Sequence, residues 1–193
     1  MRQPVYLDYN ASAPLRPEAA EYMTSLMGPA RNPSSIHSFG RSSKLIMETA
    51  RGDLAELAGG DASGFMFTSG GTEANNTALL GFEQVITCIV EHDAVLAARP
   101  DAHKIGVGID GGINLPELDS ALQQAKNRGG EILVSVMLVN NETGRIQPIE
   151  KLLKICRSYD VAFHSDMVQA LGKIPIKLDE WSRSGLTMAS FSA

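Results

Sequence analysis

Residues 131–139 read E-I-L-V-S-V-M-L-V and form the most strand-like run of the chain. A continuous apolar run of this length is typical of a strand that is buried on both faces of a sheet. A helix is predicted on each side of it. The preceding helix ends at Gly129-Gly130, and the following one opens at Pro148, where a missing N–H is tolerated in the first helical turn.

The same alternation of helix and strand continues toward both ends of the chain. A helix is predicted over 41–59, where apolar residues recur at helical spacing before Gly59-Gly60. Further strands are predicted at 64–69, 85–90, 161–166 and 186–192. Strands separated by helices form βαβ units, so the sequence predicts an α/β fold with three layers, α/β/α, around a mostly parallel central sheet.

The first forty residues have a different character. Five prolines fall within them, which predicts a loop-rich segment: Pro4, Pro14, Pro17, Pro29 and Pro33. We therefore expect an N-terminal arm over residues 1–40 and a large domain over residues 41–193.

Composition excludes several classes of protein. The 193 residues are 44% hydrophobic and 20% charged, as in a soluble globular protein. The net charge of −5 disfavours a nucleic-acid-binding surface, and no apolar run is long enough to span a membrane. The N-terminus lacks the features of a signal peptide, so we expect a cytoplasmic protein. Cys88 and Cys156 are too few and too irregularly spaced for a disulfide framework or a metal site, and are predicted to be small buried hydrophobes.

The stretch T-S-G-G-T-E-A-N-N, residues 68–76, predicts an anion site. Its two glycines allow a tight turn from strand to helix, which would leave the amides of Gly71 and Thr72 at the helix N-terminus. Amide donors, the helix dipole and the Thr72 hydroxyl would then converge on a phosphate. The alternative is a plain turn with no ligand.

Polar residues also follow the other predicted strands. His92 comes just after one strand, the amides Asn140 and Asn141 follow the next, and Asp166 ends a third, with Gln169 shortly beyond. Each has a plainer interpretation: a structural histidine, an Asx-turn, or a metal-ligating aspartate, although no His/Cys/Asp cluster accompanies Asp166.

Because ligands of α/β folds bind at the carboxyl ends of the strands, these groups are expected in one site. A phosphate cradle, an imidazole, amides and a carboxylate suit a phosphorylated aromatic cofactor with a ring nitrogen. Pyridoxal 5′-phosphate (PLP) fits best, because a carboxylate facing its ring nitrogen keeps that nitrogen protonated.

These motifs resemble those of the cysteine desulfurases, in the class V aminotransferase group of fold type I PLP enzymes. Seven stretches match in order and cover essentially the whole chain: Y-L-D-Y-N-A-S-A-P, N-P-S-S-I-H-S-F-G-R, T-S-G-G-T-E-A-N-N, E-H-D-A-V, V-N-N-E-T-G, H-S-D-M-V-Q-A-L-G-K and S-F-S-A. The resemblance implies the large cofactor domain of that fold.

The resemblance also implies a role for each candidate residue. Gly71 and Thr72 would hold the cofactor phosphate, and Ser192 would add a hydroxyl. His92 would stack on the pyridine ring and act as the catalytic residue of this part of the chain. The remaining ring contacts are implied as follows: Asp166 to the ring nitrogen, and Asn141 and Gln169 to the ring hydroxyl oxygen.

In the family, the positions matching Ser192 and Ala193 are followed by His and the lysine that binds PLP covalently. The sulfur-accepting cysteine and the substrate-binding arginine also come later. The resemblance therefore implies the N-terminal part of an enzyme that converts L-cysteine to L-alanine and a persulfide, for a sulfur-acceptor protein or iron–sulfur cluster assembly. It implies a homodimer when complete, and a 193-residue polypeptide that is inactive by itself.

Two departures from the family pattern affect substrate preference. Leu138 stands where relatives often have His, and Met167 stands where a small residue is usual. Two alternatives therefore stay open. One is another class V PLP enzyme, a selenocysteine lyase or an aminotransferase, and the other is a truncated module without catalysis.

Overall fold

The computed structural model describes residues 4–192. The chain divides into two compact units, residues 1–54 and 55–193, and the boundary falls inside helix α2 (Ser38–Ala58). The first unit contains helix α1 (Pro17–Leu26), which the proline content did not predict. Pro17 occupies the first helical turn, where its fixed φ favours a helix start, so this proline begins a helix instead of preventing one.

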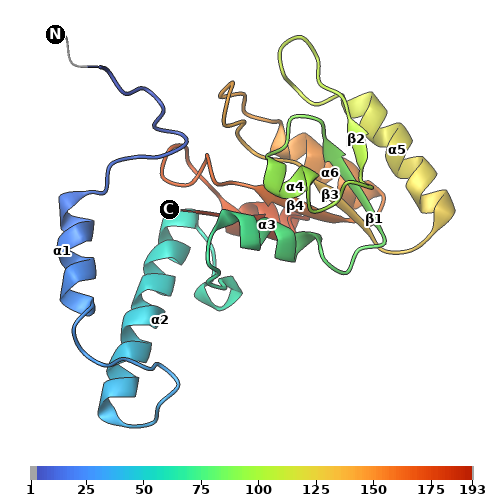
Figure 1. The fold of residues 1–193 in the computed structure, drawn as a ribbon. Coiled ribbons are helices and arrows are strands. Elements are labelled where there is room, and N and C mark those ends of the chain that lie inside the picture. The colour runs from blue at the N-terminus through green and yellow to red at the C-terminus, as the bar shows by residue number, and fades with distance from the viewer. Residues whose placement is uncertain (1–3, 193) are drawn as a thin grey trace. The chain divides into compact units, whose positions relative to one another are not determined.

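The second unit is built on a five-stranded sheet (Figure 1). Its strands are β1 (Gln84–Cys88), β2 (His103–Ile105), β3 (Ile132–Ser135), β4 (Ala162–Asp166) and β5 (Met188–Ser190). Their order is β2-β1-β3-β4-β5, and every pair is parallel. The predicted parallel α/β sheet is therefore confirmed.

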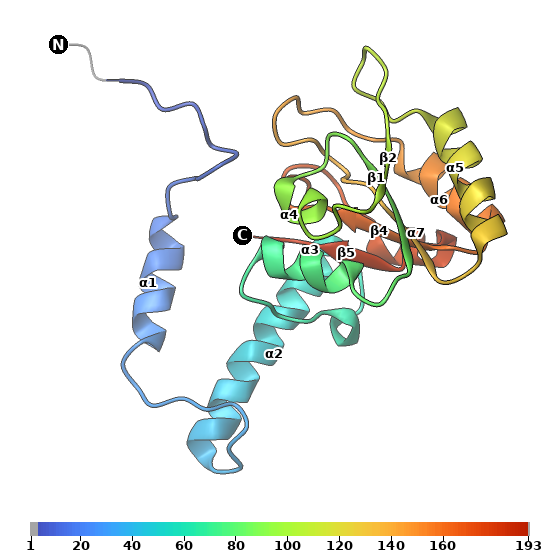
Figure 2. The same cartoon turned by 45° about the vertical axis from the view of Figure 1, so that its right-hand side comes forward.

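Helices cover both faces of this sheet, as Figure 2 shows. They are α3 (Gly71–Leu79), α4 (Asp93–Leu96), α5 (Leu115–Arg128), α6 (Ile149–Ser158) and α7 (Leu178–Ser184), and a short 3₁₀ helix, η1 (Ala62–Gly64), precedes α3 in the chain. Two separate apolar clusters show which helix covers which face. Leu79 of α3 and Val95 of α4 pack with Leu133 of β3 on one face, while α5 and α6 pack with Val134 on the other. Successive residues of β3 thus enter opposite cores, as the pleat of a strand requires.

Two predicted strands differ in the structure, and two observed elements were not predicted. Residues 65–69 form no strand, and their apolar side chains Met66 and Phe67 are 73% and 47% exposed instead of entering the sheet. The run 131–139 is assigned as strand only over β3. Its later part still follows β4, because the Val136 and Leu138 amides donate to the carbonyls of His164 and Asp166. Strand β2 and helix α7 were not predicted.

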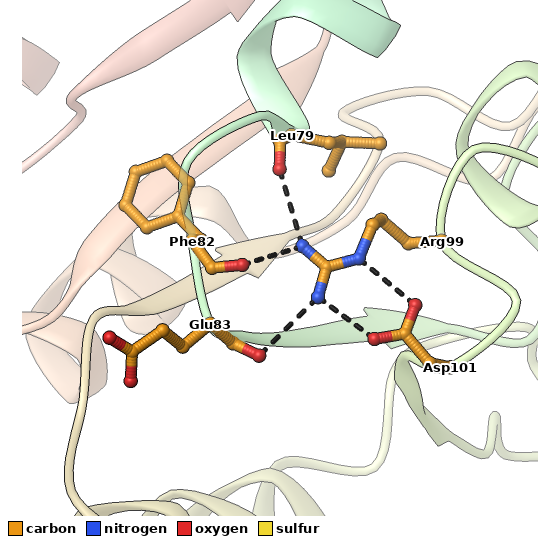
Figure 3. A network of polar contacts seen from close by, with 5 residues as sticks. All are labelled: Leu79, Phe82, Glu83, Arg99 and Asp101. Atoms are coloured by element: carbon orange, nitrogen blue, oxygen red, sulfur yellow. Dashed lines mark hydrogen bonds and ion pairs between the residues drawn. The ribbon is translucent and has the colours of Figure 1, made fainter.

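The connection between α3 and β1 is held by Arg99, which follows α4 (Figure 3). Its guanidinium donates to the carbonyls of Leu79, Phe82 and Glu83, the shortest bond being 2.8 Å to Phe82. It also forms a bidentate ion pair with Asp101, in which Nε lies 3.0 Å from Oδ1 and Nη2 lies 2.9 Å from Oδ2. The planar fork of an arginine suits this set of acceptors, which an ammonium group could not reach together.

We expect Arg99→Ala to lower the free energy of unfolding by about 2 kcal/mol, since bonds from a charged donor to partly buried carbonyls are lost. The Arg99 side chain is only 17% exposed. Asp101→Ala is the matched control, because the Asp101 side chain is 64% exposed and its loss should cost much less. Urea unfolding of both variants measures the difference, and equal losses would contradict a role for the carbonyl contacts.

Candidate functional site

Polar residues collect at the carboxyl edge of the sheet. Because all five strands are parallel, their carboxyl ends meet at that edge, where ligands of α/β folds bind. Asp166 is the last residue of β4, Ser192 follows β5, and His92 follows β1. Asn141 lies in the turn beyond β3.

The N-terminus of α3 lies beside the segment that follows β5. A methyl group at Gly71, the first residue of α3, would lie 3.1 Å from Val168 Cγ2 and 3.4 Å from Ser192 Cβ, so a glycine allows this close approach. The Gly70 N-cap has no side-chain cap, which leaves the first amides of α3 without a capping side chain. Thr72 is exposed and Gly71 is half-buried. The arrangement gives backbone amides, a helix dipole and two hydroxyls on one small area.

The same helix reaches Asp166, a contact that sequence reasoning missed. Asn75 of α3 is 1% exposed, and its Nδ2 donates to Asp166 Oδ2 at 2.7 Å. The Val168 amide donates to Asp166 Oδ1 at 3.0 Å. Both carboxylate oxygens therefore accept a hydrogen bond, and α3 connects the predicted phosphate end of the site to the predicted carboxylate end.

His92 is exposed at the start of α4. Its Nδ1 accepts the Ala94 amide at 3.0 Å, which fixes the ring orientation and leaves the proton of a neutral imidazole on Nε2. The ring therefore has a helix-capping role, and its Nε2 remains for a second partner.

The two consecutive asparagines after β3 have different environments. Asn140 is buried, and its Oδ1 accepts from the amides of Glu142 and Thr143 while its Nδ2 donates to the Val90 carbonyl. This is the Asx-turn that the plainer interpretation predicted, and it fixes the turn that carries Asn141. Asn141 and Gln169 are both half-buried on separate loops, and Gln169 accepts a hydrogen bond from Lys173.

Two buried polar atoms near this edge lack a partner among the described residues. They are Oδ1 of Asn75 and Oε2 of Glu91. Glu91 immediately precedes His92, and the motif E-H-D-A-V contained it, but only the histidine was singled out from the sequence. Unpartnered buried oxygens are uncommon in native proteins and favour a polar ligand or a proton at this position.

Neither cysteine provides a reactive group at this edge of the sheet. Cys88 is 0% exposed and Cys156 is 1% exposed, which confirms them as buried hydrophobes. Burial raises the pKa of the Cys88 thiol to about 11 and that of Cys156 to about 12, so neither is a reactive thiolate at neutral pH. Within residues 4–192, no group of three or more His, Cys, Asp or Glu could hold a metal ion. None of the helices in that range combines the length and the hydropathy that a membrane span requires.

Comparison with known proteins gives the family. The model of the family described as Aminotransferase class-V matches residues 5–193. The chain belongs to the class V aminotransferase family. Among the curated members of this family that it resembles are two named cysteine desulfurase IscS. The protein from Dictyoglomus turgidum is 40% identical over 209 residues, which cover 100% of this chain and 51% of the relative. The protein from Rickettsia bellii is 41% identical over 197 residues, which cover 92% of this chain and 46% of the relative.

Solved structures agree with this assignment. A NifS-like protein from Rickettsia africae superposes with a TM-score of 0.90 at 35% identity, over 97% of this chain and 53% of that one. A structure described as SspA in complex with cysteine gives a TM-score of 0.86 at 28% identity, over 97% of this chain and 56% of that one. The chain thus spans about half the length of the curated relatives and solved structures that it matches.

Proposed function

We propose that this chain is the cofactor-holding N-terminal part of a PLP-dependent cysteine desulfurase. The observation that carries the proposal is the pair of contacts made by α3. Its N-terminus lies against Ser192, and its buried Asn75 orients Asp166 at the carboxyl edge of the sheet. The names of the curated relatives support the choice of reaction.

The donor set fits PLP. Gly71, Thr72 and Ser192 would hold the phosphate, since uncapped amides and hydroxyls suit an anion. Asp166 accepts hydrogen bonds at both oxygens, as a carboxylate does, and would accept a further one from the protonated ring nitrogen. When bound, PLP supplies an electron-withdrawing ring.

The other predicted residues have supporting roles in this proposal. His92 would lie over the ring, its orientation fixed by the Ala94 amide, and Nε2 would hold or move a proton. Asn141 and Gln169 would donate to the ring hydroxyl oxygen. L-cysteine as substrate, a sulfur-acceptor protein and a homodimer follow from the resemblance, and together with the expected cytoplasmic location they remain parts of the proposal.

The 193-residue polypeptide is proposed to be inactive by itself, because the family's covalent lysine, sulfur-accepting cysteine and substrate-binding arginine have no counterpart in it. The residues that would hold the phosphate and the ring cannot replace a lysine that takes part in proton transfers.

We expect no sulfide from L-cysteine, PLP and a thiol reductant above a control without protein. Sulfide release above that control would contradict the proposal of inactivity. The same assay with selenocysteine or with an amino acid and a keto acid separates the two alternative class V reactions. Sequencing the coding DNA past the Ala193 codon shows whether His-Lys follows.

A further inference from the structure

Glu91 lies at the point where the connections between successive strands change direction along the sheet. Strand β2 is added on one side of β1 and β3 on the other, so the gap between β1 and β3 is the topological switch point, where ligands of such sheets bind. Glu91 follows β1 and is 6% exposed. Its Oε1 accepts the Met137 amide, beyond the end of β3, at 2.8 Å. One side chain therefore joins the two strand ends at this gap.

The second oxygen of the same carboxyl group is unpartnered. Glu91 Oε2 is buried and has no hydrogen-bond partner among the described residues. An ionised carboxylate in such a place is costly, because a single amide donor replaces its whole hydration shell. Burial accordingly raises the pKa of Glu91 well above the ordinary value of 4.5, and the nearby Asp166 raises it further.

Asp166 has the opposite environment at the same edge. Both of its oxygens accept hydrogen bonds, from Asn75 and from the Val168 amide. Its carbonyl accepts the Leu138 amide at 2.8 Å, one residue beyond the amide that Glu91 holds. The two carboxyl groups thus share one buried edge, and only one of them has the donors that a negative charge needs.

We propose that Glu91 is a positioning residue of the cofactor site that works as a neutral carboxylic acid. It holds the end of β3 through Met137 and leaves the buried negative charge of this edge on Asp166. The link to the cofactor rests on the proposed function, in which Asp166 meets the ring nitrogen.

The groups around Glu91 agree with a neutral state. Among the described residues, the titratable groups that interact with it are Asp166 on β4 and the Cys88 thiol on β1, and its partner beyond β3 is the uncharged Met137 amide. A second negative charge would repel Asp166 and compete with it for a cationic ring nitrogen. A proton on Glu91 removes that competition.

The first test measures protonation without any cofactor. The δ-carbon of Glu91 is assigned by NMR of the 13C-glutamate-labelled 193-residue chain, using Glu91→Gln to identify its signal. We expect the chemical shift of a protonated acid at neutral pH. The shift of an ionised carboxylate at neutral pH would overturn the proposal.

The second test uses the pH dependence of stability. A carboxyl group whose pKa is higher in the folded than in the unfolded state stabilises the fold fully below the unfolded value of 4.5, and this contribution falls as pH rises toward the folded value. The unfolding free energy of the wild type, relative to Glu91→Gln, should therefore fall as pH rises above 4.5. A relative gain for the wild type would overturn the proposal.

The positioning role is tested by binding of pyridoxine 5′-phosphate. Glu91→Ala leaves the Met137 amide unpartnered and should weaken binding about tenfold, and Glu91→Gln should restore most of it, since it keeps an acceptor for that amide. Equal losses in both variants would show that the charge matters and would overturn the inference. Absence of binding to the wild type would instead overturn the proposed function, while the protonation result would stand.

Discussion

Replacing Asp166 by Asn is expected to weaken the binding of pyridoxine 5′-phosphate about 30-fold, or ~2 kcal/mol, because a charge-assisted bond to the ring nitrogen becomes a neutral one. Asn keeps the shape of the side chain and an oxygen that can accept from Asn75, but its amide nitrogen cannot accept from the Val168 amide. The change therefore removes the charge and one acceptor while it keeps the packing. Pyridoxine 5′-phosphate is the chosen ligand because it keeps the ring and phosphate but lacks the aldehyde that reacts with surface lysines.

Titration calorimetry with the 193-residue chain measures this loss. Asp101→Asn is the control, because its side chain is 64% exposed and it pairs with Arg99 away from the site. Affinity for inorganic phosphate should be the same in Asp166→Asn and the wild type. An unchanged affinity of Asp166→Asn for pyridoxine 5′-phosphate would contradict the assignment of Asp166 to the ring nitrogen.

Replacing Leu133 by Ala is expected to lower the free energy of unfolding by about 3–4 kcal/mol. Leu133 is 0% exposed in β3, where it packs with the α3 and α4 side of the core. The cavity would lie in the middle of a five-stranded sheet whose backbone cannot easily close around it, so both the transfer free energy and the packing contacts are lost.

Urea unfolding measures this effect, and Leu80→Ala provides the comparison. Leu80 is 73% exposed at the end of α3, and its truncation should cost below about 1 kcal/mol. Similar losses for the two leucines would show that β3 does not lie at the centre of the folded core.

The sequence predicted the elements whose signals are local. Helix α5 was predicted to end at Gly129-Gly130, and it ends at Arg128 with Gly129 at φ 77°, a conformation that favours glycine. Strand β2 escaped prediction because only Ile105 of its three residues is buried, which leaves no alternation to detect. Its pairing with β1 depends on residues distant in the sequence.

The same distinction applies to the candidate site. His92 and Asp166 were singled out as candidates because polar residues at the ends of apolar strands stand out in a sequence. The bonds from Asn75 to Asp166 and from Met137 to Glu91 join residues 91 and 46 positions apart. No local pattern encodes such distances, so these contacts became visible only when the strands were placed side by side.

The strand order β2-β1-β3-β4-β5 also has a consequence for how the protein is made. Each strand after the first pairs with one that has already left the ribosome: β2 and β3 with β1, β4 with β3, and β5 with β4. None of the five strands among the described residues has to be inserted between two earlier ones. The sheet can therefore grow at its edges during translation: β3, β4 and β5 each cover the edge on the β1 side in turn, and β2 stays at the opposite edge.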